Sequence, residues 1–364
     1  MRVEERIYQI ALGLLSGIGS IKAKLLVSYA GGLEAVFKES KKSLAKIEGI
    51  GSVAIQSMNR EAALIRAEAE LEFIEHHDIQ LYYYQDVNYP QNLKNCEDGP
   101  VVLFSKGTVD FKRRSIAVVG TRKSTPYGKK MTHQLIEELA GMDMQIVSGL
   151  AHGIDKTAHE ASLKNGLPTL GVLGHGLDYI YPAAHRPLAK KMLENGGLVT
   201  EFVSKTPGDP SNFPKRNRIV AGLCDATVVI ESAESGGSLI TANLANDYDR
   251  DVFAFPGNAD QEQSKGCNNL IRRNRAHLIT NAEDMLNVLG WELEEKPEEQ
   301  SQLFIQMSEE EEKLVRIFRE KGEVDIDNLS HKAQMSGGVL SMHLFNLEMK
   351  GLIKVMPGKR YSLI

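Results

Sequence analysis

The feature that most constrains the fold is an alternation of short apolar segments with helical patterns between residues 79 and 289. Helical patterns of about 10 to 15 residues separate most of the apolar segments. Apolar strands that alternate with helices are typical of a parallel sheet covered on both faces. We therefore predict an α/β fold whose core is an extended, Rossmann-like parallel sheet. The predicted strands are 81–84, 101–104, 116–119, 144–147, 169–173, 198–201, 226–230, 251–255 and 277–279.

Short helices broken by glycines are predicted for the N-terminal part of the chain. The turns at 17–19 and 49–51 both have the sequence Gly-Ile-Gly, and a helical pattern follows each. We predict a helix-hairpin-helix, SAM-like domain over 1–70, followed by the Rossmann-like domain over 71–290. Such turns can offer backbone N–H groups to a nucleic-acid phosphate, but they also suit any tight helical hairpin that needs glycine at positive φ. Both interpretations stay open.

The C-terminal part is predicted to be a separate module. Residues 291–302 hold five Glu and one Pro without an apolar period, which indicates an acidic linker. Residues 303–364 have the pattern of three helices and a β-hairpin that turns at 357–358, which predicts a winged helix. Its recognition helix would be 336–350, where the basic side chains are His343 and Lys350. A helix in the major groove usually needs several contacting polar side chains, so the pattern favours protein contact or packing over DNA reading.

Composition excludes several classes of protein. The net charge of the 364-residue chain is −5, so the protein is not basic overall, although a local basic groove is compatible with this charge. The three cysteines form no C-x-x-C pair, which fits a reducing compartment and indicates neither a disulfide framework nor a zinc site. We find no export signal and no apolar run of membrane-spanning length, so we expect a cytoplasmic protein without a membrane span.

Four segments that follow predicted strands carry the chemistry, because ligands of open parallel sheets bind beyond the carboxyl ends of the strands. The first is GTRKS at 120–124. It lacks both the G-x-G-x-x-G dinucleotide pattern and the P-loop pattern. The stretch 112–130 around it contains seven Lys or Arg and no acid, against a chain that is acidic overall. We predict that this turn contacts phosphate.

The second segment is SGLAHGID at 148–155. Gly149 and Gly153 would leave backbone amides open to an anion at the start of the next helix. A plain strand-to-helix turn explains the pattern equally well. We assign no catalytic role to His152 or His159, because a lone histidine in such a turn is usually a surface or packing residue.

The third and fourth segments are NFPKRNRIVAG at 212–222 and ESAESGGSLITAN at 231–243. In the third, three cations beside Phe213 could follow a phosphate backbone while the ring stacks on an unpaired base. The alternative is a basic helix start with Phe213 packed in the core. In the fourth, a small-residue turn that leads into a helix could hold an anion. The predicted nucleic-acid-binding residues are Gly120, Thr121, Arg122, Lys123, Ser148, Gly149, Phe213, Lys215, Arg216, Asn217, Arg218, Ser235, Gly236, Gly237 and Ser238.

Six motifs, in order and spacing, resemble the DNA-processing protein A (DprA, also called Smf) family over residues 80 to 290. The motifs are VVGTR, SGLAHGID, GHGLDYIYP, FPKRNRIVAG, ESGGSLITAN, and FAFPG followed by SKGCNNLI. The resemblance implies a cytosolic single-stranded DNA-binding protein that takes incoming DNA in natural transformation and helps load the RecA recombinase. It also implies a homodimer, a phosphate-binding Arg122, and DNA contacts from Phe213, Lys215, Asn217 and Arg218.

The sequence departs from the family at one turn. The common Y-P-x-x-N is YPAAH here, with His185 in the place of Asn and Ala183 where Lys is frequent. This puts in doubt a phosphate contact from that turn.

The main alternative is a Rossmann-like nucleotide phosphoribohydrolase, whose glycine-rich turn corresponds to the fourth segment. Glu201 and Glu231 are the acids near strand ends that could act as its general base. We find no nucleophile–base pair and no metal-ligand pattern, so we expect neither an enzyme nor a bound cofactor. A double-strand DNA regulator that uses the winged helix is disfavoured by the composition of 336–350.

Overall fold

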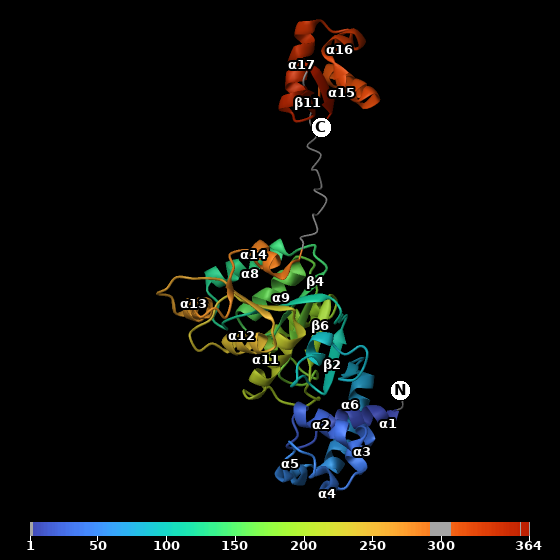
Figure 1. Cartoon of the computed structure of the whole chain (residues 1–364), viewed down its shortest axis with the longest axis vertical. Helices are drawn as coiled ribbons and strands as arrows, with labels where there is room; N and C mark the ends of the chain where they lie inside the picture. The colour runs from blue at the N-terminus through green and yellow to red at the C-terminus, as the bar shows by residue number, and fades with distance from the viewer. Residues whose placement is uncertain (1–2, 292–306, 357, 364) are drawn as a thin grey trace. The chain divides into compact units, whose positions relative to one another are not determined.

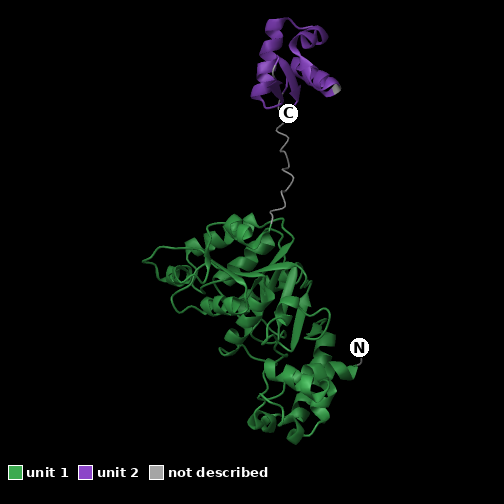
Figure 2. Ribbon diagram, in the orientation of Figure 1, with its two compact units in different colours: residues 1–294 green, residues 295–364 purple. Residues whose placement is uncertain are grey.

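The computed structural model describes residues 3–291, 307–356 and 358–363. The chain divides into two compact units, residues 1–294 and 295–364 (Figure 2). The predicted acidic linker lies outside the described residues except for Trp291, and so does Pro357 of the predicted hairpin turn.

A nine-stranded sheet forms the centre of the first unit (Figure 1), with the order β1-β2-β6-β5-β4-β3-β7-β8-β9. All nine predicted strands are present, and their bounds differ from the prediction by a few residues at most. They are β1 (Gln80–Tyr83), β2 (Val102–Gly107), β3 (Arg114–Val119), β4 (Met144–Ser148), β5 (Thr169–Val172), β6 (Gly196–Thr200), β7 (Ala226–Val229), β8 (Asp251–Ala254) and β9 (His277–Leu278).

The prediction of a parallel sheet is correct for β3 to β9 and wrong at one edge. There β1 pairs with β2, and β2 with β6, in antiparallel register. Parallel neighbours are usually joined by a crossover helix. The link from β1 to β2, residues 84–101, instead contains the one-turn helix α7 (Gln91–Lys94) and returns the chain beside β1 in the opposite direction.

Helices cover both faces of the sheet, which explains why its strands are continuously apolar. In β3, Ile116 and Val118 belong to one apolar cluster, and Ala117 and Val119 belong to the cluster on the opposite face. The first cluster includes side chains of α8 (Pro126–Glu138), α9 (Ile154–Lys164) and α14 (Ala282–Leu289). The second includes side chains of α11 (Asn212–Leu223), α12 (Gly237–Asp247) and α13 (Lys265–Arg272). α10 (Arg186–Met192) packs in a smaller cluster with Leu150 and Leu198.

Six helices precede the sheet and share an apolar cluster with its first strands. The Gly-Ile-Gly turns lie where predicted, since Gly19 and Gly51 are the N-caps of the helices that follow them. The predicted boundary at residue 70 falls inside the last of these helices. They are α1 (Val3–Gly13), α2 (Ser20–Ala30), α3 (Leu33–Lys38), α4 (Lys41–Leu44), α5 (Ser52–Ser57) and α6 (Arg60–His76). Their cluster includes Tyr83, Val102 and Phe104, so helices and sheet are packed together.

The second unit contains three helices and a three-stranded sheet of order β10-β12-β11. Its elements are α15 (Glu309–Lys321), β10 (Val324–Asp325), α16 (Ile326–Ala333), α17 (Gly337–Met349), β11 (Ile353–Met356) and β12 (Arg360–Leu363). Ser308 and Glu311 form a capping box that fixes the start of α15. None of the helices in the described parts of the chain combines the length and apolar character that crossing a membrane requires.

Candidate nucleic-acid interface

A cavity of about 560 Å³ lies beyond the carboxyl ends of β3, β4 and β7. We call it the strand-end cavity. Its wall comes from the turns after these strands and from the first turns of α11 and α12. Most of the predicted residues line it: Gly120, Thr121, Arg122, Gly149, Phe213, Arg216, Asn217, Gly236, Gly237 and Ser238.

The turn that carries Arg122 is held by backbone contacts on two sides. The amide of Thr121 donates to the carbonyl of Glu231 (2.8 Å), and the amide of Ile154 donates to the carbonyl of Thr121 (3.2 Å). Gly153 has a φ of +78°, and a Cβ atom there would lie 2.2 Å from the carbonyl oxygen of Thr121. The loop after β4 can therefore pack on this turn only because Gly153 has no side chain. The Arg122 side chain is exposed on a fixed backbone.

The Phe213 ring stands beside the Arg122 guanidinium, and the Tyr181 ring lies next to that of Phe213. The Cζ atom of Arg122 is 5.4 Å from the centroid of the Phe213 ring. The ring of Tyr181 is 6.0 Å from that of Phe213 at an angle of 30°, and Tyr181 is 51% exposed. Phe213 is therefore a half-buried wall residue and not a core residue. Sequence reasoning missed Tyr181, although the motif GHGLDYIYP contained it.

The first turn of α12 closes another side of the cavity. Gly236 is the N-cap, and Gly237 and Ser238 line the cavity. The side chain of Asn217 donates to the carbonyl of Gly237 (3.4 Å), which ties α11 to this turn. The first amides of a helix have no intrahelical acceptor, so this turn favours an anion. Ser235 is exposed and lies outside the lining of the cavity.

In the second segment, the structure favours the plain strand-to-helix turn over an anion cradle at Gly149. Asp155 Oδ2 accepts hydrogen bonds from the amides of Gly149 (3.1 Å) and Ala151 (3.3 Å), so the protein's own carboxylate occupies them. Burial raises the pKa of Asp155, although the nearby Arg216 and these hydrogen bonds oppose the shift. Ser148 is fully buried, and its hydroxyl donates to the carbonyl of Val118 (2.7 Å). Ser148 therefore has a structural role.

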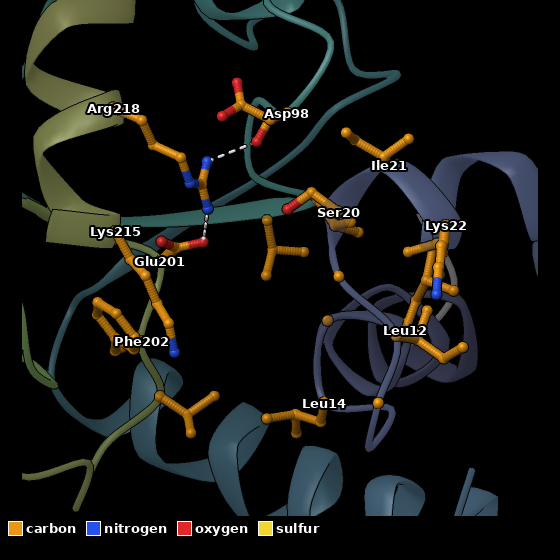
Figure 3. A pocket seen from close by; sticks show the side chains of 18 of the residues that line it. Leu12, Leu14, Ser20, Ile21, Lys22, Asp98, Glu201, Phe202, Lys215 and Arg218 are labelled. Atoms are coloured by element: carbon orange, nitrogen blue, oxygen red, sulfur yellow. Dashed lines mark hydrogen bonds and ion pairs between the residues drawn. The ribbon is translucent and has the colours of Figure 1, made fainter. Parts of the chain in front are cut away.

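The prediction that the cations of the third segment act together is wrong. The segment is helical, so its three cations lie on different faces of α11. Arg216 is 4% exposed and donates from Nη1 to the carbonyl of Val172 (2.8 Å). Burial lowers its pKa. Lys215 and Arg218 point into a second cavity, of about 590 Å³, which the turn at 17–19 also lines (Figure 3). There Arg218 is ion-paired with Glu201 and donates to the carbonyl of Asp98 (2.7 Å), so it is not available as an independent cation.

The acids and histidines near the strand ends have structural partners. Glu231 is 1% exposed and accepts hydrogen bonds from the amide (2.9 Å) and hydroxyl of Thr125, which precedes α8. His159 is fully buried, and burial lowers its pKa to about 3. His185 is also buried, with Nδ1 2.9 Å from the carbonyl oxygen of Leu150. The YPAAH turn thus places no cation at the strand-end cavity, while its Tyr181 faces that cavity.

Comparisons with known proteins match this domain. The family model for DNA recombination-mediator protein A matches residues 80–290. The protein Smf of Synechocystis sp. is 34% identical over 295 residues, which cover 80% of this chain and 74% of that protein. The X-ray structure of DNA processing protein A from Streptococcus pneumoniae superposes with a TM-score of 0.67 at 32% identity, over 79% of this chain and 98% of that one. A solved structure of DNA processing protein A from Helicobacter pylori, described by its single-stranded DNA binding mode, has a TM-score of 0.53 at 29% identity, over 59% of this chain and 96% of that one.

Proposed function

The chain belongs to the DNA recombination-mediator protein A family, and we propose that it binds single-stranded DNA at the strand-end cavity with little sequence preference. The observation that carries the proposal is the grouping of the exposed Arg122 guanidinium with the ring of Phe213 in one cavity. A guanidinium forks onto phosphate oxygens, and an aromatic ring stacks on any base. The relative from Helicobacter pylori, described by its single-stranded DNA binding mode, supports the same ligand.

The biological role that we propose follows from family membership. We propose that the protein acts in the cytoplasm as a homodimer during natural transformation, and that it helps load RecA on the bound strand. The family description as a recombination mediator supports this role. Pulldown of RecA and sizing of the protein in solution would test the two partnerships.

We propose that the protein is not an enzyme. Both candidate bases are engaged by the fold: Glu231 holds Thr125 at the start of α8, and Glu201 is paired with Arg218. A general base needs a proton within its reach. The contacts with Thr125 occupy both oxygens of Glu231, and the ion pair with Arg218 holds Oε2 of Glu201. Release of free base from nucleoside monophosphates by purified protein would instead establish the phosphoribohydrolase alternative.

The direct test of the proposal compares single-stranded with duplex oligonucleotides. We expect tighter binding to the single strand, because stacking on Phe213 and Tyr181 requires unpaired bases. Affinity should fall steeply with salt, since each phosphate contact contributes about −0.7 to the slope of log K against log salt for single strands. Fluorescence anisotropy over a salt series measures both quantities. Equal affinity for the two forms at moderate salt would contradict the proposal.

Removing residues 303–364 is expected to leave single-strand binding within about twofold of the full chain, since every residue that lines the strand-end cavity belongs to the first unit. On α17, Val339, Met342, Phe345 and Met349 are exposed at helical spacing, which is an apolar face unsuited to reading base edges. The truncated protein keeps the first compact unit whole. Gel-shift titration of both forms checks this prediction. Near-complete loss of binding by a folded truncated protein would move the DNA site to the second unit.

A further inference from the structure

A third cavity, which is basic, shares Arg122 with the strand-end cavity. Its volume is about 470 Å³, and it lies between α8 and α9, so we call it the α8–α9 cavity. Arg122 lines both cavities, so the two meet the same side chain. The residues that line it are Arg122, Lys123, Ser124, Lys129, His133, His152, Gly153, Lys156, Thr157 and Glu160.

The charges in the α8–α9 cavity favour an anion. Four of its lining residues are Lys or Arg, and Glu160 is the one acid among them. Glu160 pairs with Lys156 at 3.3 Å on the same face of α9. The chain as a whole has a net charge of −5, so this concentration of cations does not follow from composition. A positive patch of this kind in an acidic protein is typical of a binding site for a polyanion.

The lining also distinguishes this cavity from its neighbour. The strand-end cavity has Phe213 and Tyr181 in its wall, whereas none of the residues that line the α8–α9 cavity is Phe, Tyr or Trp. Long, flexible lysines suit phosphate as point charges, and they offer no face on which a base can stack. The strand-end cavity therefore suits bases together with phosphate, whereas the α8–α9 cavity, in which the only rings among the described lining residues are those of His133 and His152, suits mainly phosphate.

The geometry fixes the two cavities relative to each other. Gly153 lines the α8–α9 cavity, and the amide of the next residue, Ile154, donates to the carbonyl of Thr121, which holds the Arg122 turn beside this cavity. Lys129 and His133 are four residues apart on α8, which places them on one face of that helix. A strand that leaves the aromatic wall and crosses Arg122 therefore meets Lys129 and Lys156 next.

We propose that the α8–α9 cavity binds the phosphodiester backbone of the strand beyond Arg122, with Lys129 and Lys156 as its contacts. This proposal rests on single-strand binding at the strand-end cavity. The DNA-binding surface then has two parts. The aromatic wall of the strand-end cavity holds bases, and the lysines of the α8–α9 cavity hold the next phosphates.

The test uses the full chain and two thymidine oligonucleotides, one of about 5 nucleotides, near the lower limit of single-strand site sizes, and one of about 20. For Lys129→Ala combined with Lys156→Ala, we expect about tenfold weaker binding of the long oligonucleotide and a salt slope lower by about 1.4, from two lost contacts. Binding of the short oligonucleotide should change by less than about twofold, because its stacking on Phe213 remains. The matched control is Lys164→Ala with Lys190→Ala, which removes the same charge from exposed positions outside the cavity.

A second variant tests the sign of the effect. Glu160→Gln removes the acid of the cavity and frees Lys156, so the long oligonucleotide should bind more tightly and the short one should not change. Long-oligonucleotide binding by the double lysine variant within about twofold of wild type, or an equal loss from the control variant, would overturn the proposal. The proposal would also be overturned if binding of a polyglutamate peptide depended on the two lysines while binding of the oligonucleotides did not. If wild type fails to bind either oligonucleotide, the proposed function itself fails, which is a distinguishable result.

Discussion

Replacing Arg122 with alanine is expected to weaken single-strand binding by about one to two decades while the protein stays folded. The backbone of Thr121 holds the turn, and the Arg122 side chain is exposed, so its removal breaks no structural contact other than that with Phe213. A charge-assisted hydrogen bond to phosphate is worth about 1.5–3 kcal/mol, which gives the expected range. Arg122→Lys should recover only part of the affinity, because an ammonium cannot fork onto two phosphate oxygens. Anisotropy titration at about 0.15 M salt measures the change.

Arg273→Ala is the matched control, since Arg273 is exposed and lies outside both cavities. It removes the same side chain and the same charge, and we expect binding within about twofold of wild type. If Arg122→Ala bound as tightly as this control and melted at the wild-type temperature, Arg122 would be only a solvated surface charge. The proposal that Arg122 contacts phosphate at the strand-end cavity would then be wrong.

The strands could be predicted from the sequence because burial on both faces gives each a short, continuous apolar run. In β3, Ile116 and Val118 pack on one face while Ala117 and Val119 pack on the other, so no polar residue interrupts the pattern. The antiparallel edge was not predicted, because β1 and β2 also have the short, largely apolar pattern of the parallel strands. Strand direction depends on the connection between strands and leaves no mark in the strand itself.

The site could be predicted only in part, because sequence order does not say which face of a helix or which acceptor a residue meets. Arg122 and Phe213 follow strand ends and do face one cavity. The amide of Gly149 has the sequence context of an anion site, yet it donates its hydrogen bond to Asp155, six residues later. Arg218 has the context of a DNA contact, yet the helical turn directs it to Glu201, on a different strand end. The partner of Gly149 is local and lies within the same motif, whereas the partner of Arg218 is supplied only by the tertiary fold.

The structure consequently makes Arg218 a stability residue. Arg218→Ala is expected to lower the free energy of unfolding by about 2–4 kcal/mol near pH 7, because it leaves a mostly buried carboxylate without its partner. The side chains of Arg218 and Glu201 are 15% and 16% exposed. Urea denaturation measures the loss. Arg273→Ala is the matched control, since Arg273 is exposed and lies outside the cavity that Glu201 lines, and its loss should cost less than about 0.5 kcal/mol.

The pH dependence identifies the cause of this loss. Burial raises the pKa of Glu201 from 4.5, and Arg218 opposes that shift, so the variant should raise the pKa further. The folded variant then binds a proton that the unfolded chain has released, and its stability falls as pH rises through this window. Its deficit relative to wild type should be smallest well below pH 4.5, where Glu201 is protonated in both the folded and the unfolded chain, and largest near pH 7. Adding Glu201→Gln should recover much of the stability, since no buried charge remains. A deficit that is independent of pH, or a lost affinity for single strands without any loss of stability, would contradict the structural role and return Arg218 to the DNA interface.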